Sequence, residues 1–248
     1  MFNGREMAHM SYPLYIFFGL APSIIWLLFY LRKDVHPEPN SEVIKIFFYG
    51  MLAPLPAVFL EKGILETTSS PPFFNFFPPF LITVFNIFIG IALIEEVLKY
   101  LVVRGKVLKS SEFDEPTDAI LYMIIAALGF AALENILILF RFAPAFLLKE
   151  AFSISIFRFL GATFLHALCS GTVGAFLALS FFETKSRPKF MAVGLGLACL
   201  LHGLYNFSIM EIEGSLRFLI PIIILITLSL FVSLSFKRLK KMKSTCKI

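Results

Sequence analysis

Seven apolar runs, each about as long as a membrane-spanning helix, restrict the possible folds of this chain more than any other feature. A helix needs about 20 mostly apolar residues to cross the hydrocarbon core of a bilayer. The runs fall at about 13–31, 43–60, 80–103, 118–140, 157–182, 188–208 and 216–236. Because backbone groups in lipid must be hydrogen-bonded within their own segment, such runs form helices. The sequence therefore predicts an all-α, polytopic membrane helix bundle with about seven transmembrane helices.

The composition agrees with a membrane protein. Hydrophobic residues make up 58% and charged residues 16% of the 248 residues, whereas a soluble domain is nearer half apolar and a quarter charged. The run at 13–31 lacks a small-residue cleavage site and is followed by stronger positive charge, so we expect a retained anchor helix. We expect one transmembrane domain over residues 1–236 and a basic cytoplasmic tail over 237–248.

The distribution of basic residues predicts the orientation of the chain. With the N-terminus outside, fifteen lysines and arginines are cytoplasmic and six are outside: Arg5, Lys62, Arg141, Lys149, Arg158 and Arg217. This bias follows the positive-inside rule, so we predict a multi-pass protein of the cell membrane with N-out and C-in topology. Six of the cytoplasmic residues follow the last run: Lys237, Arg238, Lys240, Lys241, Lys243 and Lys247. Such a cluster favours anionic membrane lipid as its partner, and we expect no nucleic acid.

The third run contains three ionisable residues. Charges inside a spanning helix cost about 2.5–3.5 kcal/mol each, so they need a reason. Glu95 and Glu96 lie four and three residues before Lys99, and either carboxylate can therefore pair with the ammonium. Two adjacent carboxylates in a low dielectric cannot both ionise cheaply, so we expect the pKa of at least one of them to rise. A carboxylate with a pKa near neutrality is a candidate general base. The alternative is a charge cluster at a helix end that reaches the cytoplasmic interface.

Three later runs contribute further buried polar residues. Glu134 has no cation near it in the fourth run, so its partner must come from another helix, or it must be protonated. His166 lies in the fifth run, and the sixth carries His202 with Asn206 four residues later on the same face. Glutamate and histidine are ligands of catalytic zinc, and Glu134, His166 and His202 are therefore candidate zinc ligands.

Helix geometry allows these residues to share one layer of the membrane. At a rise of 1.5 Å per residue, Glu134, His166 and His202 lie about 21–24 Å above the inner ends of their helices. Glu96 reaches the same layer, near 20 Å, if the third helix continues to about Lys109.

The cysteines offer an alternative metal site that would use the same two histidines. Cys169 follows His166 by three residues, and Cys199 precedes His202 by three, so together they could form a Cys₂His₂ site. The alternative is that these cysteines pack between helices as small residues. With Cys246 the count is odd, which gives no disulfide framework.

The motifs, taken in order, resemble the PrsW family of intramembrane proteases, distant relatives of the CAAX-processing and bacteriocin-immunity proteases. The resemblance runs from about Asp34 to Phe207. It rests on Asp34 with Pro37-Glu38-Pro39, Glu95-Glu96-Val97-Leu98-Lys99, Glu115-Pro116-Thr117-Asp118, Gly129-Phe130-Ala131-Ala132-Leu133-Glu134-Asn135, His166 to Ser170, and His202-Gly203-Leu204-Tyr205-Asn206.

The resemblance implies a membrane-embedded peptidase that cuts single-pass membrane proteins, typified by release of an anti-sigma factor. It places the catalytic elements on Glu95, Glu96, Glu134, His166, His202 and Asn206. Water would be activated by Glu95 or Glu96, with zinc or without it, and Asn206 would steady the oxyanion. Asp118 is followed by Ala119, where the family pattern has glycine. CAAX relatives carry histidine where Glu134 stands, which disfavours prenyl-protein processing.

Two other functions use the same residues differently. A proton- or ion-coupled transporter would use the buried glutamates and histidines as a relay. A catalytically inactive scaffold would bind another membrane helix without cutting it. Cleavage of a single-pass protein distinguishes the protease from both.

Overall fold

The structure is a computed structural model that describes residues 4–33, 36–106, 113, 115–142 and 148–242. Helices dominate this described part, and it contains no strand. Seven segments of it are long and apolar enough to cross a membrane: Tyr12–Leu31, Asn40–Thr68, Pro79–Lys106, Pro116–Arg141, Lys149–Phe182, Thr184–Glu211 and Leu216–Leu239. The predicted all-α, polytopic bundle with seven spans is confirmed. Residues mentioned above that lie outside the described part are Asp34, Lys109, Lys243, Cys246 and Lys247.

The second span is longer than the predicted 43–60. It consists of α2 (Asn40–Leu52) and α3 (Pro54–Thr68), with a break at Ala53. Because Pro54 has no N–H to continue the hydrogen-bond ladder, the helix restarts there. The extension carries the helix past Glu61, which lies just beyond the predicted end at residue 60.

The third span changes its helical geometry midway. After the short turn α4 (Pro71–Phe74), it consists of α5 (Pro79–Phe85), a π-helix (Asn86–Leu93) and α6 (Ile94–Lys106). A π-helix takes more residues per turn than an α-helix and is frequent at functional sites. The extra residues per turn therefore rotate the side chains on the first turn of α6 relative to those of α5. The predicted continuation to Lys109 lies outside the described residues.

The fifth span begins earlier than the predicted 157–182. It consists of α8 (Leu148–Leu160) and α9 (Ala162–Phe182), which meet at Gly161 with φ −107° and ψ −95°. Arg158, counted above as an outer-loop residue, therefore lies on a helix inside this span. The side of the membrane on which Arg158 lies remains a prediction.

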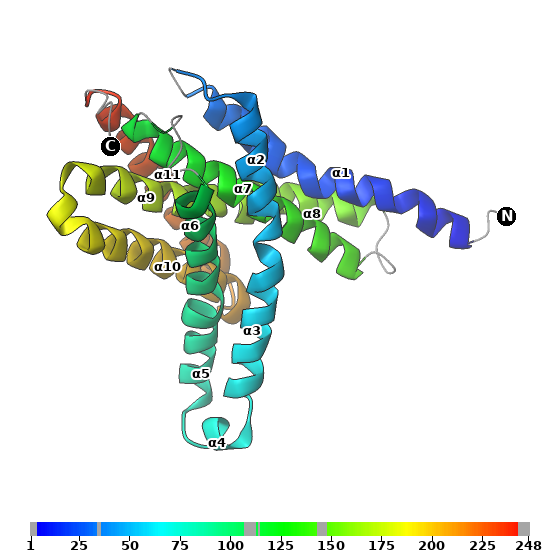
Figure 1. Ribbon diagram of the computed structural model, residues 1–248. Coiled ribbons are helices and arrows are strands. Elements are labelled where there is room, and N and C mark those ends of the chain that lie inside the picture. The colour runs from blue at the N-terminus through cyan, green and yellow to red at the C-terminus, as the bar shows by residue number, and fades with distance from the viewer. Residues whose placement is uncertain (1–3, 34–35, 107–112, 114, 143–147, 243–248) are drawn as a thin grey trace.

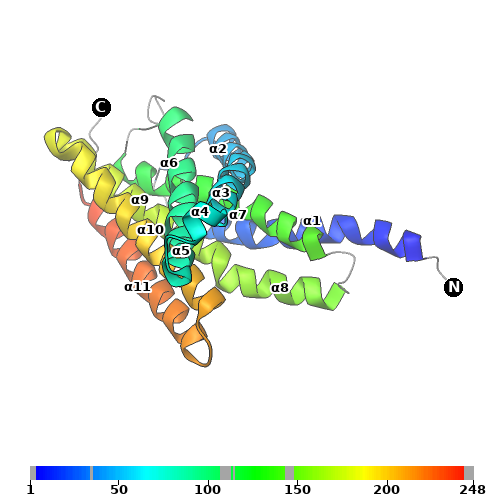
Figure 2. The ribbon, with the colours of Figure 1, turned by 90° about the horizontal axis from the view of Figure 1, so that it is seen from below.

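The fourth and fifth spans form the centre of the bundle. In their most apolar windows 72% and 78% of the residues are buried inside the protein, against 22–33% in the other spans. The central helix α7 (Pro116–Phe142) packs against α1 (Gly4–Leu31), α2 and α9. The hairpin formed by α2–α3 and α5–α6 projects from the remaining helices, with α4 at its tip (Figures 1 and 2).

Small residues bring α2 and α7 into backbone contact. A Cβ atom added to Gly129 would collide with the carbonyl oxygen of Phe47, and one added to Gly50 would collide with that of Ala126. Close approach of this kind is how transmembrane helices pack where no hydrophobic effect drives them together. The contact fixes the α2–α3 segment against α7, and with it the position of Glu61.

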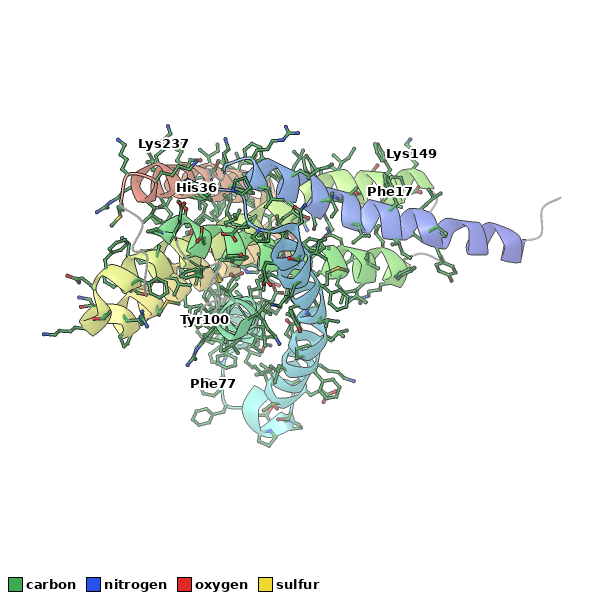
Figure 3. All side chains as sticks on the ribbon, turned by 45° about the horizontal axis from the view of Figure 1, so that its top comes forward. Phe17, His36, Phe77, Tyr100, Lys149 and Lys237 are labelled. Carbon is green, nitrogen blue, oxygen red and sulfur yellow. The ribbon has the colours of Figure 1, made fainter. Side chains whose placement is uncertain are left out.

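The C-terminal ends of α1 and α11 (Leu216–Leu239) lie together. The ammonium of Lys240 donates a hydrogen bond to the carbonyl oxygen of Lys33. Figure 3 shows Lys237 and His36 at the same end of the molecule. The N-out, C-in orientation remains a prediction.

The boundary of the predicted basic tail falls inside a helix. Helix α11 ends at Leu239, so the tail predicted over 237–248 begins with helical residues. A single domain over 1–236 remains a prediction. The sixth span consists of a short turn (Thr184–Ser186) and α10 (Arg187–Glu211), which leads to α11.

Candidate active site

The buried lysine of α6 lies between the two carboxylates of the same helix. Lys99 is completely buried, and its Nζ is 2.8 Å from Oε1 of Glu96 and 3.2 Å from Oε2 of Glu95. The Lys99 ammonium also lies 4.4 Å from the centre of the Phe130 ring, a cation–π contact. This cluster is internal, so the helix-end alternative raised by the sequence does not describe it.

Lys99 also reaches the fifth span. Its Nζ lies 2.7 Å from Nδ1 of His166 on α9. Since an ammonium only donates, Nδ1 is the acceptor and the proton of the neutral ring is on Nε2. Nε2 lies 2.8 Å from Oε2 of Glu134 on α7, to which it donates. The imidazole therefore connects the lysine of one helix to the carboxylate of another.

The second histidine is held by the deeper carboxylate. Nδ1 of His202 on α10 lies 3.0 Å from Oε1 of Glu96, which accepts a hydrogen bond from the Nδ1–H group. The hydroxyl of Ser170 donates to Oε2 of Glu96 at 2.9 Å. This arrangement leaves the Nε2 lone pair of His202 toward Glu95, whose Oε2 is 3.9 Å away. The rings of His166 and His202 are 5.0 Å apart and nearly perpendicular.

The partner of Glu134 comes from another helix, as one reading of the sequence required. Nη2 of Arg158 on α8 lies 2.9 Å from Oε2 of Glu134. Its Nε donates to Oδ1 of Asn135, whose Nδ2 donates in turn to Thr163 at 3.1 Å. This network fixes the guanidinium of Arg158 beside the carboxylate of Glu134.

A cavity of about 650 Å³ lies beside the site residues, and all but one of the predicted residues line it. Glu95, Glu134, His166, His202 and Asn206 line it, so five of the six residues predicted from the sequence face one space. Glu96 is completely buried and does not line the cavity. Its carboxylate contacts Lys99, Ser170 and His202.

Three polar residues of the cavity wall were missed by sequence reasoning: Glu61, Arg158 and Tyr205. The first two lie at the edges of the predicted spans, where charged residues are normally solvated. Tyr205 belongs to a segment quoted for the family resemblance, but tyrosine in a spanning helix is not by itself a signal. For Arg158, the unpaired Glu134 was the available signal, since it demanded a cation from elsewhere.

Carboxyl groups outnumber cations around the cavity. Glu95, Glu96 and Glu134 outnumber the two cations, Lys99 and Arg158, by one carboxylate. Glu61 is a further carboxyl group on the cavity wall. The rest of the lining is largely apolar. This surplus of carboxyl groups over cations is compatible with a bound cation.

One group of metal-binding side chains is compact. Single donor atoms of Glu95, His166 and His202 all lie within 4.8 Å of one another. This group differs from the predicted ligand set by having Glu95 in place of Glu134. Within the described residues, no group of this kind includes a cysteine, so the Cys₂His₂ alternative gains no support.

The other segments of the resemblance hold the scaffold together. Glu38 accepts a hydrogen bond from the hydroxyl of Tyr122, and His36 pairs with Glu115. Asp118 accepts the backbone N–H of Glu115 at 2.7 Å, where α7 begins. None of these residues lines the cavity. They fasten the connection after α1 to the start of α7.

Comparison with known proteins gives a consistent result over most of the chain. Residues 38–234 match the family described as PrsW family intramembrane metalloprotease. The chain is 31% identical to Protease PrsW of Geobacillus kaustophilus over 79% of both chains. Identity to Protease PrsW of Bacillus subtilis is 30%, over 83% of this chain and 87% of that one. Identity to Protease PrsW of Oceanobacillus iheyensis is 29%, over 84% and 88%.

No solved structure matches the chain. The segment that matches the family contains every residue that lines the cavity.

Proposed function

Because this chain belongs to the PrsW family of intramembrane metalloproteases, we propose that it hydrolyses a peptide bond of a single-pass membrane protein in the cavity lined by Glu95, Glu134 and His202. The observation that carries the proposal is that carboxyl and imidazole groups from five spans face one largely apolar cavity. A peptide segment can be held against the apolar wall while water is activated by the polar one.

Glu134 is the residue that accepts the proton of the attacking water. It faces the cavity, with 28% of its side chain exposed, and Nη2 of Arg158 lies 2.9 Å from its Oε2. A carboxylate must be deprotonated to act as a base, and proton transfer of this kind contributes about 10²–10⁴-fold to rate. Glu96, which the sequence allowed as a base, has no access to the cavity.

Glu95, His166 and His202 would hold the metal that the family description implies. Two imidazoles and one carboxylate are a catalytic zinc set, and the surplus of carboxyl groups around the cavity is compatible with a divalent cation. Lys99 donates to Nδ1 of His166, and Nε2–H donates to Glu134. His166 would therefore offer Nε2 to the metal only after Nε2 gives up this proton and its hydrogen bond to Glu134. Bound zinc would polarise a carbonyl and lower the proton affinity of water.

Glu96 and Lys99 position these groups. Glu96 fixes the tautomer of His202 by accepting from Nδ1, as carboxylates commonly do for metal-binding histidines. Lys99 compensates the charge of Glu96 in a completely buried setting. Asn206 lines the cavity one helical turn after His202, where its amide can donate to a developing oxyanion.

The substrate class follows from the resemblance and from the setting of the site. We infer that the substrate is a membrane-anchored protein such as an anti-sigma factor. Cleavage would take place in the cell membrane, where we expect this chain to lie with its N-terminus outside and its C-terminus inside. The apolar part of the cavity wall suits a substrate segment that enters from the lipid. Membrane lipid is the second partner that we propose for this protein. Nucleic acid has no place in this activity.

The test uses purified protein in liposomes with tagged single-pass proteins, anti-sigma factors among them. Wild type and Glu66→Gln, which alters an exposed carboxylate of α3, are expected to release the same fragment. Glu134→Gln is expected to release none. Equal cleavage by all three proteins would refute the proposal. Proton flux without any cleavage would favour the transporter instead.

A further inference from the structure

A second hollow in the protein lies away from the catalytic residues, where α1, α9 and α11 meet. It has a volume of about 750 Å³. Lys33, Lys237 and Lys240 line one end of it, and none of its lining residues among the described part of the chain is acidic. One end of an otherwise apolar hollow therefore carries three positive charges.

Aromatic side chains form a rigid wall along this hollow. The rings of Trp26 and Phe164 stack with centroids 4.0 Å apart and an angle of 8° between their planes. The indole N–H of Trp26 donates to the carbonyl oxygen of Phe159 at 2.8 Å. Tyr30 and Phe236 continue the wall toward the lysines, with their rings stacked 6.4 Å apart. The wall keeps its shape without an occupant.

The hollow continues toward the catalytic cavity. A smaller hollow of about 400 Å³ shares Trp26, Phe164 and Ser229 with it. That smaller hollow shares Leu160, Ile222 and Leu225 with the catalytic cavity. Fifteen residues of α11 separate Lys237 from Ile222, which is about 22 Å along a helix. We call the two hollows together the basic groove.

We propose that the basic groove binds an anionic phospholipid, with the phosphate at the three lysines and an acyl chain along the aromatic wall toward the catalytic cavity. Basic pockets between transmembrane helices are known to take anionic headgroups. A length of about 22 Å suits an acyl chain that crosses much of one leaflet. The lipid ends where the catalytic cavity begins.

The charge of the groove favours lipid over a peptide helix. Single-pass segments usually carry lysine or arginine at their cytoplasmic end, and these would be repelled by the three lysines. A phosphate group is attracted to the same place. A transmembrane segment is therefore the competing occupant that the test must distinguish.

The first experiment measures lipid retention by native mass spectrometry of the purified full chain from nanodiscs with equal phosphatidylglycerol and phosphatidylcholine. The double variant Lys33→Gln/Lys237→Gln removes two groove lysines. Its matched control is Arg32→Gln/Arg238→Gln, which removes two exposed charges at neighbouring positions that do not line the groove. Each lysine near an anionic headgroup contributes about a fivefold effect on binding.

We expect the groove variant to retain roughly twentyfold less phosphatidylglycerol than wild type, and the control to retain as much as wild type. Retention of phosphatidylcholine should not change. Equal loss in both variants, or no loss in either, overturns the proposal.

A second variant keeps all charges. Ser229→Trp fills the groove at the point that both hollows share, whereas Thr227→Trp adds the same volume at an exposed position of α11. Only Ser229→Trp should reduce phosphatidylglycerol retention. If instead lipid retention is unchanged and Ser229→Trp blocks cleavage of substrate alone, the groove holds a peptide segment. Lipid retention does not require catalysis, so repeating it in Glu134→Gln protein separates this proposal from the proposed function.

Discussion

Nδ1 of His202 lies 3.0 Å from Oε1 of Glu96, although 106 positions separate the two residues in sequence. The carboxylate is completely buried, and the imidazole presents its other nitrogen to the catalytic cavity. The adjacent glutamates of α6 therefore differ in their surroundings, since Glu96 contacts His202 away from the cavity and Glu95 lines the cavity wall. In the proposed function Glu96 positions His202.

These surroundings predict different effects for the two glutamine variants. Glu96→Gln breaks a buried ion pair with Lys99 and should destabilise the protein by about 3 kcal/mol. Its proteolysis should fall by about 10–100-fold, as for other supports of metal ligands. Unfolding in mixed micelles and the initial cleavage rate are the measurements. Glu66→Gln, on an exposed carboxylate, should change the unfolding free energy by less than about 0.5 kcal/mol.

The pair formed by Glu134 and Arg158 should show energetic coupling. Both side chains are largely buried and 2.9 Å apart. A double-mutant cycle with Glu134→Gln and Arg158→Gln should give about 1–2 kcal/mol of coupling in unfolding free energy. The exposed pair of Lys62 and Glu66 is the control and should give at most about 0.5 kcal/mol. Coupling no larger in the buried pair would show that Arg158 does not support Glu134.

The order and number of the spans could be predicted from the sequence because apolar runs report burial in lipid directly. The helical rise also placed Glu134, His166 and His202 in one layer, and the structure brings them around one cavity. What failed were the edges of the spans. The fifth span begins at Lys149 and not at the predicted residue 157, so Arg158 lies well inside a helix and not at the edge of one.

Two other features had no sequence signal. The π-helix over Asn86–Leu93 consists of eight residues, nearly all apolar, that would suit an α-helix equally well. The rotation that it gives to the side chains of α6 can be recognised only from the other helices that these side chains contact. The separation of Glu95 from Glu96 is of the same kind, since adjacent residues of one helix differ only in what the other helices place beside them.

Close packing of α2 on α7 predicts a strong size limit at Gly129. Gly129→Leu would drive a side chain into the backbone of Phe47 and should destabilise the protein by about 1–3 kcal/mol or more. Gly63→Leu adds the same side chain where no atom lies within 4 Å, so it should leave unfolding unchanged or slightly favour the helix. Unfolding midpoints of the two variants decide the question. Equal midpoints would mean that the two helices are not in backbone contact.

Metal removal should abolish proteolysis and zinc should restore it. Purified wild type is expected to contain zinc, held by Glu95, His166 and His202. His202→Gln should lose the metal, whereas His36→Gln, at an exposed histidine outside the cavity, should retain it. Metal analysis of the three proteins is paired with cleavage assays before and after chelation. Full activity of metal-free wild type would disprove the zinc assignment.

If side chains from separate spans form one catalytic unit, their substitutions should have non-additive effects on the cleavage rate. Cleavage rates of one substrate are measured for wild type, Glu95→Gln, His202→Gln and the double variant in liposomes. Residues that act as a unit give a double variant no slower than the slower single variant, and this is the result expected here. Rate losses that multiply in the double variant would show that Glu95 and His202 act independently, and would contradict a shared site.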